Sequence, residues 1–238
     1  SAATAGYSVC AVDYFGDLDL KSLCLHSESI IQQRAGESSG TIEACYSPRG
    51  LLNIARRVVS ECRPQFTLLA SGLDDSVDVL EELNELTPVL GNPPDAIERV
   101  RDKKIFFDEL DRLNIRHPPT EFIGYREEAE AAAARIGFPV VLKPWSTSGG
   151  ERIEFVKNRR GLMESFDRLR RSSTCVLLQR YVPGKHASVS VVSTSHRARS
   201  LAVTEQILGD QRLFQQHVFG WCGNVVRISV HQDVVEEC

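Results

Sequence analysis

The sequence lacks the local motifs that most directly reveal a metal or nucleotide site. It contains no CxxC pair and no HExxH, and because a zinc site would need such paired spacing, we predict none. No GxxxxGK[ST] loop of the Walker type occurs, and no run of eighteen apolar residues predicts a membrane span. Internal repeats and low-complexity tracts are also missing. We therefore expect an ordinary globular chain without any of these elements.

Neither sign of charge dominates the chain. With 28 Lys and Arg against 32 Asp and Glu, the net charge is −4, which argues against a nucleic-acid partner. Basic residues gather in Asn158–Arg171, but Glu164 and Asp167 interrupt them at helical spacing. That mixture is typical of an exposed helix face.

The seven cysteines are an odd number and are widely spaced. Several lie in apolar stretches, a pattern that favours reduced, buried thiols in a cytoplasmic protein. The acidic turn containing Asp13, Asp17 and Asp19 lacks the spacing of a calcium loop. Turn and cap functions are therefore favoured over a metal site for these three carboxylates.

The first part of the chain alternates between strand-like and helix-like segments. Ser47 followed by Pro48 marks a helix start, because serine is a good N-cap residue and proline is tolerated at the first helical position. The alternation indicates an α/β domain over residues 1–94, with a parallel sheet and helices on its faces. We expect this sheet to be incomplete, and both ends of the chain to lack structure that the intact protein has. The predicted segments are strands at 7–12, 66–70 and 88–90 and helices that begin near 48 and 75.

A stiff NPPD junction precedes residues 95–238, for which we predict a second domain of the α+β type. Asp95 and Glu98 fit a capping box that opens a helix. Residues from about 120 to 181 should form a compact subdomain, followed by two antiparallel strands. The predicted segments are strands at 121–123, 138–143, 152–156, 175–181, 187–193 and 199–208 and helices at 102–115, 126–136 and 160–170.

The stretch GFPVVLKPWSTSGG, residues 137–150, joins an apolar run to a lysine and a glycine-containing loop. Phe138–Leu142 has no polar residue on either face, which predicts a fully buried strand. Lys143 then stands at the end of a hydrophobic layer, and taken alone it fits a lysine that extends to the surface. The loop after it offers hydroxyl and backbone N–H groups without bulky side chains, as a phosphate-binding loop does, although ordinary turns also use a glycine pair.

Two further segments could face the same ligand. Lys103 begins the predicted helix at 102–115, where a lysine is slightly unfavourable unless it meets an anion; a charged first turn is the alternative. LLQRYVPGKH, residues 177–186, runs from a strand into a Pro-Gly turn. The backbone there could hydrogen-bond a base, or the turn could simply lead out of the strand.

In this order the segments resemble the ATP-grasp superfamily, over nearly the whole chain. DKKIFFDELDRLNIRHPPT resembles its entry segment, FPVVLKPWSTSGG its adenine-lysine strand and phosphate lid, and VLLQRYVPGK its hinge. The opening AGYSVCAVDYFGDLDL is similar to the preceding domain in a subgroup of predicted ATP-dependent carboligases. The resemblance implies a pre-ATP-grasp α/β domain and an α+β ATP-grasp domain whose C-terminal part is missing.

The resemblance also implies roles for particular residues. Lys143 would reach the adenine ring and the α-phosphate, and Lys103 would meet the phosphates from the other side. The lid over the triphosphate would consist of Ser148, Gly149 and Gly150. The backbone that hydrogen-bonds adenine would be that of Gln179, Arg180, Tyr181 and Val182, and the ribose contact would come from His186.

Three departures from the family pattern stand out. Gln179 occupies a position that is often glutamate, and His186 occupies that of a ribose-binding acid. No Glu-x-Asn-Pro-Arg-like segment follows, and Glu236 and Glu237 directly precede the final cysteine. The ligands of Mg²⁺ are therefore expected in the missing C-terminal part.

The function implied is that of an ATP-dependent ligase. It would activate a small carboxylate as an acyl phosphate, which an amine or another nucleophile then attacks; residues 1–238 alone are expected to be inactive. Two alternatives stay open: a biotin-carboxylase-like enzyme that uses bicarbonate, and a nucleotide-binding module without catalysis. ATP, the carboxylate and its acceptor are the expected partners, and because family members are often dimers a homodimer is also considered.

Overall fold

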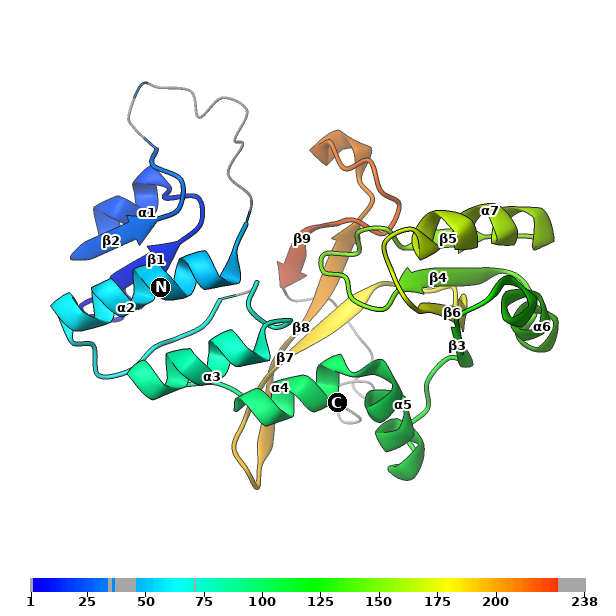
Figure 1. Cartoon of the computed structure of the whole chain (residues 1–238), viewed down its shortest axis with the longest axis horizontal. Helices are drawn as coiled ribbons and strands as arrows, with labels where there is room; N and C mark the ends of the chain where they lie inside the picture. The colour runs from blue at the N-terminus through cyan, green and yellow to red at the C-terminus, as the bar shows by residue number, and fades with distance from the viewer. Residues whose placement is uncertain (1, 34–35, 37–45, 71, 227–238) are drawn as a thin grey trace. The chain divides into compact units, whose positions relative to one another are not determined.

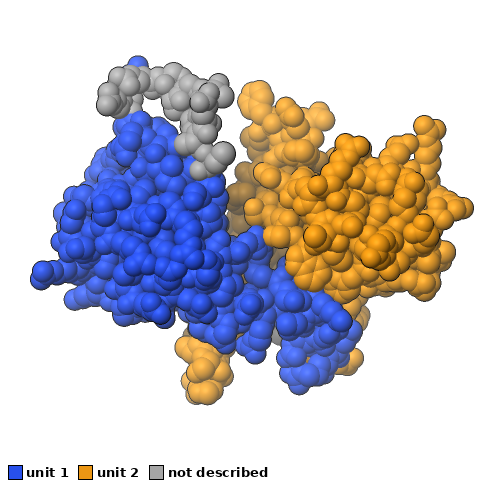
Figure 2. Space-filling view, in the orientation of Figure 1, with its two compact units in different colours: residues 1–112 blue, residues 113–238 orange. Residues whose placement is uncertain are grey.

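The computed structural model describes residues 2–33, 36, 46–70 and 72–226 and divides into two compact units. The first unit comprises residues 1–112 and the second residues 113–238 (Figure 2). The predicted domain boundary between residues 94 and 95 falls earlier in the chain than this division and stays a prediction. None of the helices among the described residues is long and apolar enough to cross a membrane.

The first unit contains a parallel strand pair with helix α2 packed against both strands (Figure 1). A single parallel bridge joins Thr67 to Val89 where two longer strands were predicted, since Pro88 has no N–H with which to extend the ladder. The short helix α1 and the strand β2 were not predicted. The described elements of this unit are β1 (Cys10–Asp13), α1 (Leu18–Leu23), β2 (His26–Ser29), α2 (Pro48–Cys62), α3 (Val77–Leu86), α4 (Pro94–Arg101) and α5 (Lys103–Arg112).

Helix α2 begins as the sequence predicted. The Ser47 side chain accepts a hydrogen bond of 3.1 Å from the Gly50 N–H, and Pro48 is the first helical residue. Its apolar face packs against α3 around a core of Leu52, Ala55, Val79 and Leu83. Asp13 has the predicted turn function, because one of its carboxylate oxygens accepts from two backbone N–H groups of the turn, whereas Asp17 is the N-cap residue of α1 without a side-chain cap hydrogen bond.

Three local predictions are wrong. Helix α4 starts at Pro94 with Pro93 as its N-cap, so Asp95 lies inside the first turn and forms no capping box with Glu98. The described cysteines are unpaired, as predicted, but they are partly exposed and not buried. Phe138, predicted within a buried strand, is 39% exposed and precedes the strand that begins at Val140.

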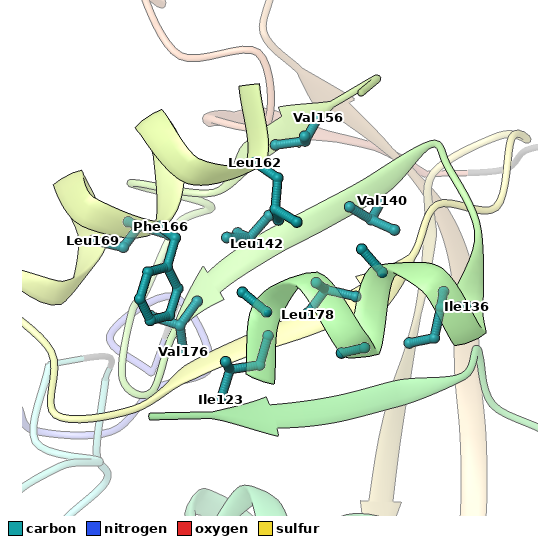
Figure 3. Packing of buried hydrophobic residues seen from close by; sticks show 13 residues of the cluster. Ile123, Ile136, Val140, Leu142, Val156, Leu162, Phe166, Leu169, Val176 and Leu178 are labelled. Atoms are coloured by element: carbon teal, nitrogen blue, oxygen red, sulfur yellow. The ribbon is translucent and has the colours of Figure 1, made fainter. Parts of the chain in front are cut away.

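The second unit is built on a four-stranded antiparallel sheet in the order β3-β6-β4-β5, with α6 and α7 covering one face (Figures 1 and 3). Apolar side chains from the strands and both helices fill the layer between them, among them Ile123, Leu142, Leu162 and Leu178, none measurably exposed. The elements are β3 (Thr120–Ile123), α6 (Arg126–Ile136), β4 (Val140–Pro144), β5 (Glu154–Val156), α7 (Arg159–Arg170) and β6 (Val176–Arg180).

A second sheet of the described residues follows in the same unit, with the antiparallel order β7-β8-β9. The pairing of β7 with β8 confirms the two antiparallel neighbours predicted from the sequence. The elements are β7 (Ala187–Ser193), β8 (Ala198–Leu208), the short 3-10 helix η1 (Gln211–Leu213) and β9 (Trp221–Val226). Together, the parallel pair of the first unit and the antiparallel sheets of the second confirm the predicted α/β and α+β classes.

Candidate nucleotide site

The four-stranded sheet has two chemically different faces. Side chains alternate across a strand, so Val140 and Leu142 point toward the helices while Val141 and Lys143 lie on the opposite face. The cross-strand register brings Gln179 of β6 opposite Val141 on that second face. The face away from α6 and α7 thus carries a lysine and an amide on an otherwise apolar surface.

A chain of hydrogen bonds fixes the lysine and the amide. The Lys143 ammonium donates to Oε1 of Gln179 at 2.7 Å, and Nε2 of Gln179 donates to the Thr120 hydroxyl oxygen at 2.7 Å. The Thr120 hydroxyl in turn donates to the carbonyl oxygen of Pro118 at 2.8 Å. Gln179 is only 8% exposed, so each of these groups needs the partner that it has.

This arrangement gives a physical meaning to glutamine at position 179. A carboxylate there would form an ion pair with Lys143, whereas the neutral amide leaves the positive charge of Lys143 uncompensated by this neighbour. The Thr120 hydroxyl selects the amide orientation that presents oxygen to the lysine. Gln179 therefore contacts Lys143 without neutralising its charge.

The predicted hinge follows directly from β6. The Arg180 N–H donates to the Pro119 carbonyl at 2.9 Å and the Tyr181 N–H donates to the Pro139 carbonyl at 3.1 Å. In the described part of the chain, the Val182 N–H donates no hydrogen bond. The Tyr181 ring packs edge-on against Phe155 of β5, with ring centroids 4.7 Å apart. The N–H groups of Arg180 and Tyr181 thus anchor the strand end on both sides, and the N–H of Val182 is the first after them that can donate to a ligand.

The glycine loop after β4 packs closely against the start of β9. The Trp221 N–H donates to the Gly149 carbonyl at 2.8 Å, and a Cβ on Gly150 would lie 1.8 Å from the Phe219 carbonyl oxygen. Both glycines have a positive φ, +61° and +76°, which side chains disfavour. Ser148 is exposed beside them. The glycine pair thus permits a close backbone contact, and the side chain of Trp221 beside it is 50% exposed.

Lys103 lies in the first unit, as the first residue of α5. The Asp102 carboxylate accepts from the N–H groups of Lys104 and Ile105, which confirms the predicted helix start. Burial and the neighbouring Arg101 lower the pKa of the Lys103 ammonium below its ordinary value, a cost that a bound anion would relieve. Because Lys103 and Lys143 belong to different units, their convergence on one ligand stays a prediction.

His186 just precedes β7 and is exposed. Its carbonyl oxygen accepts from the Gln206 N–H at 2.8 Å, which fixes its backbone against β8. A ribose contact from its imidazole stays a prediction. Glu236 and Glu237 lie outside the described residues.

Two contributions to this site were not predicted. Thr120 lies just before the strand predicted at 121–123, and its link to Gln179 depends on the β3–β6 register, which no local pattern shows. The contact of the glycine loop with Phe219 and Trp221 joins segments far apart in sequence. The glycines in both segments were the available signal, since a glycine often marks a close approach of two backbones.

The second unit is thus an antiparallel α+β domain with a lysine, a buried amide and a glycine loop at one sheet. The sequence model of one family, the ATP-grasp domain, matches residues 100–238, more than half of the chain. The chain belongs to the ATP-grasp family, a family of ATP-binding ligases.

Known proteins show how far this similarity extends. A 69-residue stretch is 42% identical to the carbamoyl phosphate synthase large chain of Pseudomonas syringae pv. tomato, covering 29% of this chain and 6% of that protein. Biotin carboxylase from Campylobacter jejuni, solved with β,γ-ATP, matches with a TM-score of 0.70 at 16% identity, covering 88% of this chain and 48% of that one. The biotin carboxylase domain of 2-oxoglutarate carboxylase from Hydrogenobacter thermophilus, solved as a dimer with MgADP and bicarbonate, gives 0.67 at 18% identity, covering 86% and 46%. At these identities the structural matches establish the fold, and the chain spans about half the length of those structures.

Proposed function

We propose that this chain supplies the nucleotide-binding face of a ligase that activates a small carboxylate with ATP. The observation that carries the proposal is the hydrogen-bonded series Lys143–Gln179–Thr120 on the face of the sheet away from α6 and α7, where Lys143 belongs to the strand that leads into the glycine loop. Surface lysines seldom end on a buried amide that a third residue orients. A held ammonium of this kind suits recognition of a phosphate close to a base.

The backbone after β6 supports the adenine part of this proposal. Adenine presents a ring nitrogen that accepts and an amino group that donates, so a strand edge can read it with one N–H and one carbonyl. The N–H of Val182 is available, while those of Arg180 and Tyr181 already hold the strand in place. We assign the N–H of Val182 and the carbonyl of Arg180 as the donor and acceptor for adenine.

The chemistry proposed is phosphoryl transfer followed by acyl transfer. A carboxylate oxygen attacks the γ-phosphorus, the bond to the bridging oxygen of ADP breaks, and an acyl phosphate forms. An amine or another nucleophile then attacks the acyl carbon and inorganic phosphate leaves. Lys143 and Lys103 would offset the charge that accumulates on the phosphate oxygens, and the glycine loop with Ser148 would exclude the water that hydrolyses acyl phosphates.

Mg²⁺ is expected to arrive with the nucleotide. Among the described residues of the second unit, no group of three or more His, Cys, Asp and Glu side chains lies close enough to hold an ion. We therefore assign no magnesium ligand to these residues. We also expect residues 1–238 alone to bind nucleotide weakly and not to turn it over.

The test is calorimetric titration of the chain with ATP and with ADP, comparing Lys143→Ala with Lys157→Ala. Lys157 lies just after β5 in the same unit and is exposed, so it controls for the loss of one positive charge. Losing a charged hydrogen-bond donor should cost about 2 kcal/mol, roughly thirtyfold in affinity, at position 143 only. Equal affinities for the two variants would remove Lys143 from the site.

Use of bicarbonate as the carboxylate is the second candidate, favoured by the structural match to the domain solved with bicarbonate. ATP turnover by a form of the protein that contains the whole ATP-grasp domain should then depend on bicarbonate and not on an added carboxylate and amine. ATP binding without turnover under any acceptor mixture would favour a module without catalysis. A homodimer stays a prediction, which sedimentation equilibrium can test.

A further inference from the structure

The end of the β8–β9 connection, residues 209–220, packs against the glycine loop. The Trp221 N–H donates to the Gly149 carbonyl at 2.8 Å, and the Phe219 carbonyl oxygen occupies the place where a Cβ of Gly150 would lie. Both contacts are made by backbone atoms, so their geometry depends on how the connection holds its own chain. Whatever fixes the shape of the connection therefore also fixes the support of the glycine loop.

Apolar burial contributes little to the shape of this connection. Three of its apolar side chains are largely exposed: Leu213 at 54%, Phe214 at 93% and Val218 at 70%. Hydrogen bonds within the segment are present instead, and the Gly209 N–H closes its base by donating to the Gly220 carbonyl at 2.8 Å. Polar and backbone contacts must therefore fix the conformation of this segment.

The Gln215 side chain holds the end of the connection. Its Oε1 accepts from the His217 N–H at 3.0 Å, and the His217 carbonyl accepts from the Gly220 N–H at 2.9 Å. The amide group of Gln215 also packs directly on Gly220, where an added Cβ would lie 2.1 Å from the Gln215 Cδ. Gln215 is partly buried and Gly220 is buried, and only glycine leaves room for the amide at position 220.

We propose that Gln215 is a positioning residue for the glycine loop, because it fixes the backbone of Phe219 and Trp221 on which Gly149 and Gly150 pack. This inference rests on the proposed function, in which the glycine loop closes over the triphosphate. A loop whose support is already in place loses less conformational freedom when the nucleotide binds, so less of the binding free energy is spent on ordering it. Since Gln215 acts through the glycine loop, its effect belongs to the triphosphate and not to adenosine.

The test compares Gln215→Ala with Gln216→Ala in the full chain, since Gln216 is the next residue and is exposed. Calorimetric titration with ATP and with adenosine measures the affinities, and hydrogen exchange followed by NMR measures the protection of the Trp221 amide. Gln215→Ala should weaken ATP binding about fivefold and leave adenosine binding unchanged, because the unsupported loop must then be ordered on binding. It should also speed exchange of the Trp221 amide, whereas Gln216→Ala should change none of these quantities.

Two further measurements separate positioning from a general loss of structure. Gln215→Glu keeps an acceptor oxygen for the His217 N–H and should restore most of the ATP affinity. In the wild-type chain, ATP should slow exchange of the Trp221 amide and adenosine should not. The wild-type measurement keeps the proposal testable if a Gln215 variant fails to fold.

The outcomes distinguish this inference from the proposed function. If Lys143→Ala weakens ATP binding but Gln215→Ala and Gln216→Ala bind ATP equally, the positioning role is wrong and the proposed function stands. Equal losses of ATP and adenosine affinity in Gln215→Ala, or unchanged exchange of the Trp221 amide, would also overturn the positioning role. A wild-type chain that binds no ATP would refute the proposed function and, with it, the role of Gln215.

Discussion

Gly150 is the residue at which the glycine loop comes closest to the β8–β9 connection. A Cβ there would lie 1.8 Å from the Phe219 carbonyl oxygen, and no side-chain rotation can relieve a clash with backbone. Gly150→Ala should therefore separate the loop from Phe219 and break the hydrogen bond from the Trp221 N–H to Gly149. We expect the Trp221 amide to exchange with solvent roughly tenfold faster than in the wild type, measured by NMR.

Gly149→Ala is the matched control for this change. Its φ of +61° is as unfavourable for alanine as that of Gly150, but nothing lies within 4 Å of the added Cβ. It should lose roughly 1 kcal/mol of stability from backbone strain and still protect the Trp221 amide. If both variants lost protection equally, strain in the loop rather than contact with Phe219 would explain the effect.

Single residues were predictable to the extent that their chemistry is local. The apolar run before Lys143 showed that this lysine stands at the edge of a buried layer, and its partner Gln179 was identified as a departure from a family pattern. That the two bond to each other depends on the register of β4 with β6. Because strand register depends on the packing of the whole sheet, the sequence around either residue does not predict it.

At the scale of elements, a hydrogen-bonded pair attaches α7 to β5. Arg168 donates two hydrogen bonds of 2.5 Å to the Glu154 carboxylate, and Ser165 donates a third of 2.6 Å. Burial would raise the pKa of Glu154, but the hydrogen bonds from Arg168 and Ser165 outweigh it and lower the pKa below the ordinary value of 4.5. A lowered pKa in the folded state stabilises the protein above pH 4.5, and this stability is lost as the pH falls through the folded value.

Glu154→Gln should therefore destabilise the chain on the order of 1–2 kcal/mol at pH 7. The difference from the wild type should begin to shrink below pH 4.5, where the unfolded chain takes up the proton, and should disappear below the lower pKa of the folded state, where the native carboxylate is also neutral. Glu164→Gln is the control, since its pair with Arg160 on the same helix is exposed and contributes little. Urea denaturation at pH 7 and pH 4 measures both, and a pH-independent loss in Glu154→Gln would refute the electrostatic account.

The elements themselves followed from the sequence wherever their periodicity was strong. Helix α6 begins and ends at the predicted residues, because Tyr125 starts it and Gly137 ends it. The parallel strands of the first unit were less predictable: β2 has the polar sequence HSES, which no hydrophobic pattern marks. Its pairing with β1 and its packing against α2 are tertiary contacts, which a polar four-residue sequence does not reveal.

At the scale of the whole molecule, a domain boundary at the NPPD junction stays a prediction, while the compact units divide after Arg112. Helix α4 packs against both α3 and α5, which keeps all three helices with the first unit. A proline-rich junction indicates where the chain turns, but it does not determine which elements the next helix packs against. Lys103 consequently belongs to a different unit from the other proposed nucleotide ligands.

If the two units bind one nucleotide together, Lys103 should contact its phosphates while the sheet of the second unit contacts the base. Lys103→Ala should then weaken ATP binding about tenfold, because a charge-assisted contact is lost, and leave adenosine binding unchanged. Lys104→Ala controls for charge, since Lys104 is the next residue of the same helix and is exposed. Calorimetric titration of each variant with ATP and adenosine separates the two contributions. If Lys103→Ala and Lys104→Ala weakened ATP binding equally, Lys103 would contribute only general electrostatic attraction. The nucleotide would then be bound by the second unit alone.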